Sequence, residues 1–294
     1  MYVLVAVAAL AVYANSIRND FALDDVMIVQ NNAHVQNLDW AQIWSDNYWP
    51  KEGGVAPDIL YRPLTIWTYL VNQYFTPGAS WAFHLTNVLL HALVSLLVMA
   101  LAWRLFGHRR GGAGIALASG LLFALHPLHT EAVANTVGRA ELLAALFSLL
   151  ALLVYLPAGP LMEAPLERRA WWHGLLPAAC FFAAMLSKET PVTLLAAFLF
   201  IDCWRWTHAA ERPSIVSWLW RRTWRYYAPL LAAFGVYMAM RINACGLRES
   251  AKQTSPVVKP RMTATVAERI VTPFVLFGKY IMLFLYFIQC FCKV

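Results

Sequence analysis

The chain has 294 residues, of which 60% are hydrophobic and only 13% are charged. Soluble globular domains carry about 25% charged residues, so this composition excludes an ordinary soluble domain and indicates a polytopic membrane protein. The formal net charge is +7, but the basic residues fall mainly in short segments between apolar runs, as membrane orientation requires, and do not indicate nucleic-acid binding. The five scattered cysteines lack metal-ligand spacing and predict neither a disulfide framework nor a zinc site.

Apolar segments recur along the whole sequence. A helix needs about 20 apolar residues to cross a bilayer, with a range of about 17–25. About eight membrane spans are therefore expected, at 1–17, 82–106, 113–127, 141–158, 172–187, 190–204, 227–243 and 270–292. The first segment lacks the basic start of a signal peptide, so we interpret it as a retained helix. The whole chain, 1–294, is expected to be one all-α transmembrane domain.

The connections between these segments alternate in charge. Basic residues concentrate in 104–112, 159–171 and 205–226. Lys and Arg mark cytoplasmic connections, so the remaining ones are expected to face the lumen or the exterior. These are 18–81, 128–140, 188–189 and 244–269. The last of them is also basic, which means either that the rule is overridden there or that its cations meet an anionic ligand.

The long connection 18–81 is acidic and rich in Trp and Tyr. Aromatic residues at this density suit helices that lie at the membrane interface, whereas a disordered linker would be depleted in them. Its first notable feature is the adjacent pair Asp24-Asp25. Neighbouring carboxylates in a poorly solvated site cannot both ionise freely, and the raised pKa of one suits a general acid or base near neutral pH. The simpler alternative is an acidic helix cap beside Leu23.

The segment 126–131 closes the third apolar run with two histidines and a glutamate. Pro127 stops or kinks a helix, so His126, His129 and Glu131 are expected to gather at its outer end. Three interpretations stay open for these side chains. They could bind a divalent metal, hydrogen-bond a phosphate, or satisfy one another.

Several cations fall on the same predicted face as Asp24. Arg62, Arg139 and Lys188 could bind a phosphate, because a guanidinium makes bidentate contacts and an ammonium supplies a point charge. The alternative for the last two is a local ion pair, since Glu141 and Glu189 are close by in the sequence.

The apolar helix expected at 82–106 carries polar residues along one face. His84, Asn87 and His91 share one of its faces, and such side chains usually bond a neighbouring helix. His84, nearest the outer end, could reach the site. We therefore expect one polar site that faces away from the cytoplasm.

Ordered motifs over about residues 10–205 resemble a known family. They are Tyr13-Ala14-Asn15-Ser16, Asp24-Asp25, Tyr61-Arg62-Pro63-Leu64, Phe83-His84-Leu85-Thr86-Asn87-Val88, the run from Leu122 to Glu141, and Leu186-Ser187-Lys188-Glu189-Thr190. This order resembles the transmembrane and tetratricopeptide-repeat O-mannosyltransferases and their bacterial relatives, which are glycosyltransferases of the GT-C class. The resemblance implies a GT-C-like helical bundle.

The resemblance also implies a reaction. Such an enzyme moves a sugar, mannose in this family, from a polyprenyl- or dolichyl-phosphate to a Ser/Thr hydroxyl of a protein, or to a glycan acceptor, usually with inversion. It implies Asp24 as the base and Asp25 as its supporting partner. Arg62, His84, His126, His129, Arg139 and Lys188 are assigned to the donor phosphate. The site would face the lumen of the endoplasmic reticulum in a eukaryote, or the exterior of the plasma membrane in a bacterium.

The sequence departs from this family after residue 205. The family continues through further spans and tetratricopeptide repeats, and no such repeats occur here, so a truncated or inactive membrane scaffold is an alternative function. A transporter is a further alternative, but it would be expected to show inverted repeats and ionisable groups near the bilayer midplane.

Overall fold

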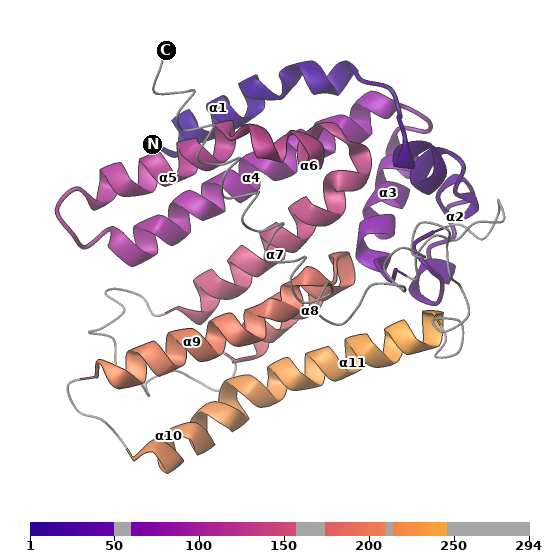
Figure 1. Cartoon of the computed structure of the whole chain (residues 1–294). Coiled ribbons are helices and arrows are strands. Elements are labelled where there is room, and N and C mark those ends of the chain that lie inside the picture. Colours follow the sequence, from indigo (N-terminus) through magenta and orange to yellow (C-terminus); the bar gives the residue numbers. More distant parts are fainter. Residues whose placement is uncertain (50–59, 157–173, 210–213, 246–294) are drawn as a thin grey trace, which may run out of the picture.

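The computed structural model describes residues 1–49, 60–156, 174–209 and 214–245, and within these ranges the regular secondary structure is all helical, without a strand (Figure 1). The longer helices are α1 (Tyr2–Val12), α3 (Pro63–Phe75), α4 (Ser80–Phe106), α5 (Gly112–Leu125), α7 (Arg139–Tyr155), α8 (Leu175–Ser187), α9 (Leu194–Thr207), α10 (Ile215–Arg222) and α11 (Ala228–Cys245). The shorter ones are η1 (Ala14–Arg18), η2 (Val26–Gln30), α2 (Ala33–Gln36), η3 (Gln42–Trp44), η4 (Pro127–His129), α6 (Thr130–Ala134), η5 (Thr136–Gly138), η7 (Thr190–Thr193) and η8 (Thr223–Tyr227).

Glycine and proline mark the helix boundaries. Gly111, with a left-handed φ of 79°, turns the chain between α4 and α5, a conformation that L side chains rarely adopt. Pro63 begins α3, where its missing N–H costs no hydrogen bond. Pro127 follows the end of α5, and the chain bends by 47° into the next helical segment. Gly120 lets α1 and α4 approach α5 closely, because a Cβ there would lie 2.9 Å from Met99 Cβ.

Among the residues that the structure describes, three helical segments are long and apolar enough to cross a membrane. They are Ser80–Phe106, Thr136–Tyr155 and Ile215–Cys245, and the bent pair Gly112–Leu125 and Pro127–Ala134 would make a fourth. The other expected segments are helical but shorter, such as α1 and α8, or are interrupted. The run 190–204, for example, starts as a short turn around Pro191, and α9 carries Asp202 and Arg205. The expectation of about eight spans is thus not confirmed by the described residues, and 270–292 lies outside them.

The helices pack in two groups that share α7. Helix α4 contacts α1, α5 and α7, while α8 contacts α7 and α11. The short helices of the connection 18–81 gather with α3 at one end of the molecule (Figure 1). They enclose their own apolar cluster, which includes Ile28, Val35, Ile66, Tyr69 and Phe83. This cluster fixes the segment that carries the acidic pair against the N-terminal end of α4.

A buried ion pair joins α9 to α10, away from the end of the molecule where the short helices gather with α3. Arg222 donates to Asp202, which is fully buried, and the Tyr227 hydroxyl donates to the other carboxylate oxygen at 2.9 Å. The Arg222 guanidinium also lies over the Tyr226 ring, 4.6 Å from its centroid. Removing one partner of such a pair leaves an uncompensated buried charge, which is more costly than losing a surface pair.

Arg222→Met is therefore expected to lower the free energy of unfolding by about 3–5 kcal/mol. Unfolding in detergent micelles measures the change, with Arg109→Met in the exposed turn between α4 and α5 as the matched control, expected to stay within about 0.5 kcal/mol. Asp202→Leu in the Arg222→Met background should restore much of the loss. Equal destabilisation by the Arg222 and Arg109 variants would contradict the structural role of the pair.

Candidate functional site

A cleft of about 540 Å³ opens at the N-terminal end of α7 and collects charged side chains from distant parts of the sequence. Its polar lining consists of Asp24, Arg62, His129, Glu131, Asn135, Glu141 and Lys188. Its apolar lining includes Val94 of α4, Phe123 of α5, and Leu142 and Ala145 of α7. The cleft therefore has a charged part and an apolar wall.

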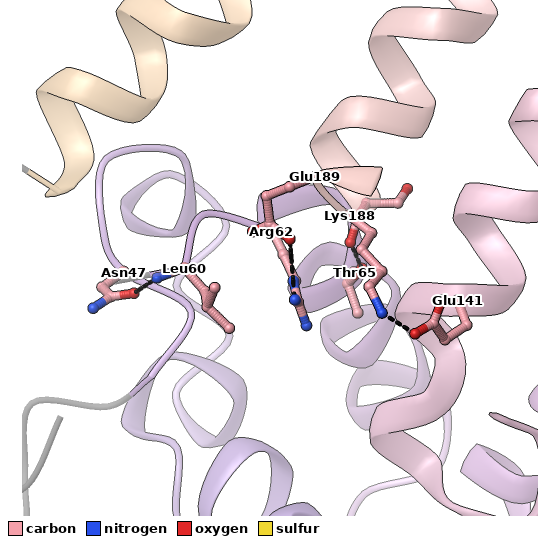
Figure 2. A network of polar contacts seen from close by, with 8 residues as sticks. Asn47, Leu60, Arg62, Thr65, Glu141, Lys188 and Glu189 are labelled. Atoms are coloured by element: carbon pink, nitrogen blue, oxygen red, sulfur yellow. Dashed lines mark hydrogen bonds and ion pairs between the residues drawn. The ribbon is translucent and has the colours of Figure 1, made fainter. Parts of the chain in front are cut away.

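Two ion pairs cross this region (Figure 2). Lys188 pairs with Glu141 in the first turn of α7, and Arg62 donates from Nε and Nη2 to Glu189 Oε2 at 3.3 and 3.0 Å. Lys188 follows α8 with an extended backbone, φ −158° and ψ 160°, so its side chain and that of Glu189 reach different elements. Each of these carboxylates pairs with a cation from another part of the chain, in contrast to the local pairs that sequence proximity suggested.

The end of α8 is held against α3 close to these pairs. Thr65 Oγ1 donates to the carbonyl oxygen of Ser187 at 3.0 Å, and both residues are buried (Figure 2). Burial, followed by the nearby Arg62 guanidinium, lowers the pKa of Lys188 from its ordinary 10.5. Thus Lys188 is a partly desolvated cation held in a defined position at the cleft.

The two aspartates of the acidic pair have different environments. Asp24 is exposed and lines the cleft, whereas Asp25 is 1% exposed and accepts the backbone N–H groups of Thr136 and Val137 at 3.2 and 2.8 Å. Burial raises the pKa of Asp25, and the hydrogen bonds from Val137 and Thr136 oppose that shift. Leu23 precedes them with a φ of 50°, a left-handed conformation that is strained for a leucine. Asp25 ties this segment to η5, the turn that leads into α7.

Arg139 lies behind the cleft lining and is fully buried. Its Nε donates to Asn87 Oδ1 at 2.9 Å, Nη1 to Asn72 Oδ1 at 2.6 Å and to the Thr68 carbonyl at 3.1 Å, and Nη2 to the Phe83 carbonyl at 2.9 Å. The guanidinium also lies over the Tyr69 ring, 4.7 Å from its centroid. These contacts join the start of α7 to α3 and α4, so in this structure Arg139 supports the cleft instead of entering it.

The polar stripe of α4 faces neighbouring segments. Asn87 Nδ2 donates to the Asn135 carbonyl at 2.9 Å, and His91 Nε2 lies 3.0 Å from the Ala124 carbonyl. His84 is 1% exposed and is not part of the cleft lining. For Asn87 and His91, bonding between helices is the role expected of polar residues on such a face.

The two histidines around Pro127 are separated by their backbone turn. The His129 ring packs against Phe123 with 4.1 Å between centroids and lines the cleft with Glu131. The His126 ring lies 5.9 Å from that of His129, and its Nδ1 accepts the Leu128 N–H at 3.2 Å. Throughout the part of the chain that the structure describes, no group of three or more His, Cys, Asp or Glu side chains is placed to hold a metal ion.

Sequence reasoning missed the apolar wall and the acceptors of Arg139. Leu142 and Ala145 are three residues apart on α7, a spacing that places both on one helix face and could have marked the wall. Thr68 and Asn72 are four residues apart on α3, a spacing that also places both on one helix face. Their common partner lies on another helix, and the local sequence does not contain that information.

Asp25→Ala is expected to destabilise the protein, because two backbone N–H groups lose their acceptor. Each buried donor left unsatisfied costs about 1–3 kcal/mol, whereas Asp24→Ala should change the free energy of unfolding by less than about 0.5 kcal/mol. Thermal unfolding of both variants in detergent micelles makes the comparison. Equal stability of the two variants would refute the division of the pair into a buried and a cleft-lining carboxylate.

Comparison with known proteins finds similarity over about two thirds or more of the chain. The chain is 36% identical over 220 residues to the protein O-mannosyl-transferase TMTC1 of Mus musculus, covering 72% of this chain and 23% of that protein. It is 34% identical over 217 residues to TMTC2 of Mus musculus, covering 72% and 25%, and 35% identical over 199 residues to TMTC4 of Homo sapiens, covering 64% and 27%.

These relatives are much longer, and the chain spans about a quarter of the length of each. No protein-family model matches the chain, and no solved structure is significantly similar to it. The consistent identity to several O-mannosyl-transferases of one kind shows that the chain belongs to a TMTC-like family.

Proposed function

We propose that this chain forms the membrane-embedded part of a GT-C-type protein O-mannosyltransferase, which moves mannose from a polyprenyl- or dolichyl-phosphate to a Ser or Thr hydroxyl. The names of the relatives support the reaction class. The observation that carries the proposal is the cleft, because it brings an exposed carboxylate, Asp24, together with the cations Arg62 and Lys188. The site would face the lumen of the endoplasmic reticulum, or the exterior of a bacterial plasma membrane.

The donor is an amphipathic molecule, and the cleft lining has matching parts. Lys188 and Arg62 would hold the phosphate, since an ammonium and a guanidinium both donate charge-assisted hydrogen bonds to phosphate oxygens. His129 would lie at the same polar end. The wall of Val94, Phe123, Leu142 and Ala145 offers an apolar surface to the first isoprene units of the carrier.

Asp24 would act as the general base. As the acceptor oxygen attacks the anomeric carbon, its proton passes to an Asp24 carboxylate oxygen, and the bond from that carbon to the phosphate oxygen breaks. The electron pair of the broken bond leaves with the phosphate, where Lys188 and Arg62 stabilise the added charge. Attack opposite to the leaving phosphate inverts the anomeric centre. No metal is needed for these steps, and a divalent ion would serve only to neutralise the phosphate further.

The remaining predicted site residues would act in support. Asp25 holds the strained turn that presents Asp24, and Arg139 fixes the start of α7 through α3 and α4. His84 and His126 stay assigned to the donor side, where they would shape the surroundings of the cleft instead of touching the phosphate. These are positioning roles, so conservative substitutions should alter kcat and stability together.

Asp24→Asn should lower mannosyl transfer by about 10²–10⁴-fold, since the amide cannot accept the acceptor proton. The measurement is transfer from dolichyl-phosphate-mannose to a Ser/Thr-rich peptide in reconstituted membranes. Asp20→Asn is the matched control, because Asp20 is an exposed acid of the same segment, bonded to Ser80 Oγ and outside the cleft lining. It should retain transfer.

Other outcomes separate the alternatives. Transfer that survives Asp24→Asn would keep the enzyme and remove Asp24 as its base. If the folded wild-type chain transfers no sugar from any polyprenyl-phosphate donor, the proposal fails for this chain and an inactive scaffold of the same family takes its place.

Donor binding should also weaken at alkaline pH. Because the pKa of Lys188 is lowered, its ammonium loses the proton, and with it the attraction for phosphate, at a lower pH than an ordinary lysine. Lys188→Arg should bind the donor unchanged from about pH 7 to about pH 10, because a guanidinium stays protonated there. The donor is a phosphodiester with one constant charge, so its Kd measured over this range reports the protein. If the wild type and Lys188→Arg lose donor affinity in parallel as the pH rises, the assignment of Lys188 is contradicted.

A further inference from the structure

Both cations of the cleft are already paired with carboxylates. Arg62 is bonded to Glu189, and Lys188 is bonded to Glu141. The charged side chains that line the cleft comprise three acids, Asp24, Glu131 and Glu141, and two bases. The cleft lining therefore has no excess of positive charge, and a phosphate must compete with carboxylates for its cations.

The two ion pairs differ in how readily they could open. Glu189 has a side chain that is 23% exposed, receives two nitrogens of Arg62 and does not line the cleft. Glu141 is 51% exposed and lines the cleft. A carboxylate that is half in solvent can swing away from its partner without being desolvated elsewhere. The less exposed Glu189 accepts two charge-assisted hydrogen bonds on one oxygen, Oε2, and both would have to break for the pair to open. Lys188–Glu141 is thus the pair that an incoming anion can exchange.

We propose that Glu141 is a competing anion that occupies the Lys188 ammonium until the phosphate of the donor displaces it, so that Glu141 sets the affinity for phosphate. The inference rests on the proposed function for the identity of the donor, but the exchange itself concerns any phosphate that enters the cleft. Displacement replaces one anion by another on the same ammonium, so Lys188 stays compensated throughout.

The exchange also favours release of the product. The donor phosphodiester carries one negative charge, while the polyprenyl phosphate left after transfer carries between one and two near neutral pH. A bare pair of cations would hold this product more tightly than the donor. The return of Glu141 to Lys188 opposes that preference, because the carboxylate is tethered beside the ammonium and competes at high effective concentration.

The test is equilibrium binding of inorganic phosphate and of a short-chain polyprenyl phosphate to the full chain in detergent micelles. Glu141→Gln should tighten binding about fivefold or more, and Glu141→Asp, whose shorter side chain reaches Lys188 less well, should give a smaller gain. Glu131→Gln is the matched control, since it removes the same charge from the same cleft without breaking the Lys188–Glu141 pair. It should increase the phosphate affinity less than Glu141→Gln does. In a Lys188→Gln background the gain should vanish.

Unchanged or weaker binding by folded Glu141→Gln, or an equal gain from Glu131→Gln, would overturn the proposal. A gain with both ligands assigns the exchange to the phosphate group itself, and a gain with the lipid phosphate alone assigns it to a headgroup anchored by its chain. Binding is measured without turnover, so it tests the exchange separately from the transferase. If the wild-type chain transfers no sugar but Glu141→Gln still tightens phosphate binding, the transferase is refuted and the exchange stands.

Discussion

The arrangement of the cleft depends on the hydrogen bonds of the fully buried Arg139 guanidinium. Moving a charge out of water costs several kcal/mol unless its hydrogen-bonding groups are satisfied, and here the side chains and carbonyls of α3 and α4 satisfy them. Because Arg139 is also the first residue of α7, this network fixes where α7 begins. Glu141, two residues on, and the N–H groups just before Arg139 that donate to Asp25 are positioned by the same contacts.

Adjacent residues serve different structures at two places around the cleft. Asp24 lines the cleft while Asp25 is bonded to η5, and Lys188 meets α7 while Glu189 meets the residue before α3. Asp24 and Asp25 are helical and follow the left-handed Leu23, and consecutive side chains of a helix point about 100° apart. At the second place the backbone of Lys188 is extended, which turns successive side chains to opposite sides. In both ways one short segment can build the site and anchor it.

The proposed reaction requires a balance between holding a phosphate and releasing it. Paired cations lower the affinity that two free ones would have, and they also avoid the cost of an uncompensated charge in the empty protein. An apolar wall beside this charged end suits a substrate that carries both a phosphate and a lipid chain. The relatives are named protein O-mannosyl-transferases, which is the reaction class of the proposed chemistry.

Composition and hydropathy alone determined that the chain is helical and membrane-like. The alternation of basic connections predicted one face for a larger set of polar residues. The cleft lining includes Asp24, Arg62, His129, Glu131 and Lys188 of this set but not His84, His126 or Arg139. Both inferences depend on local sequence, which reports how well a segment suits an apolar environment. Tertiary structure decided which residue of each adjacent pair faces the cleft, that Arg139 is buried behind it, and that Arg62 meets Glu189 across 127 residues. Such pairings depend on distances between helices, and these are set by side-chain packing that no local pattern encodes.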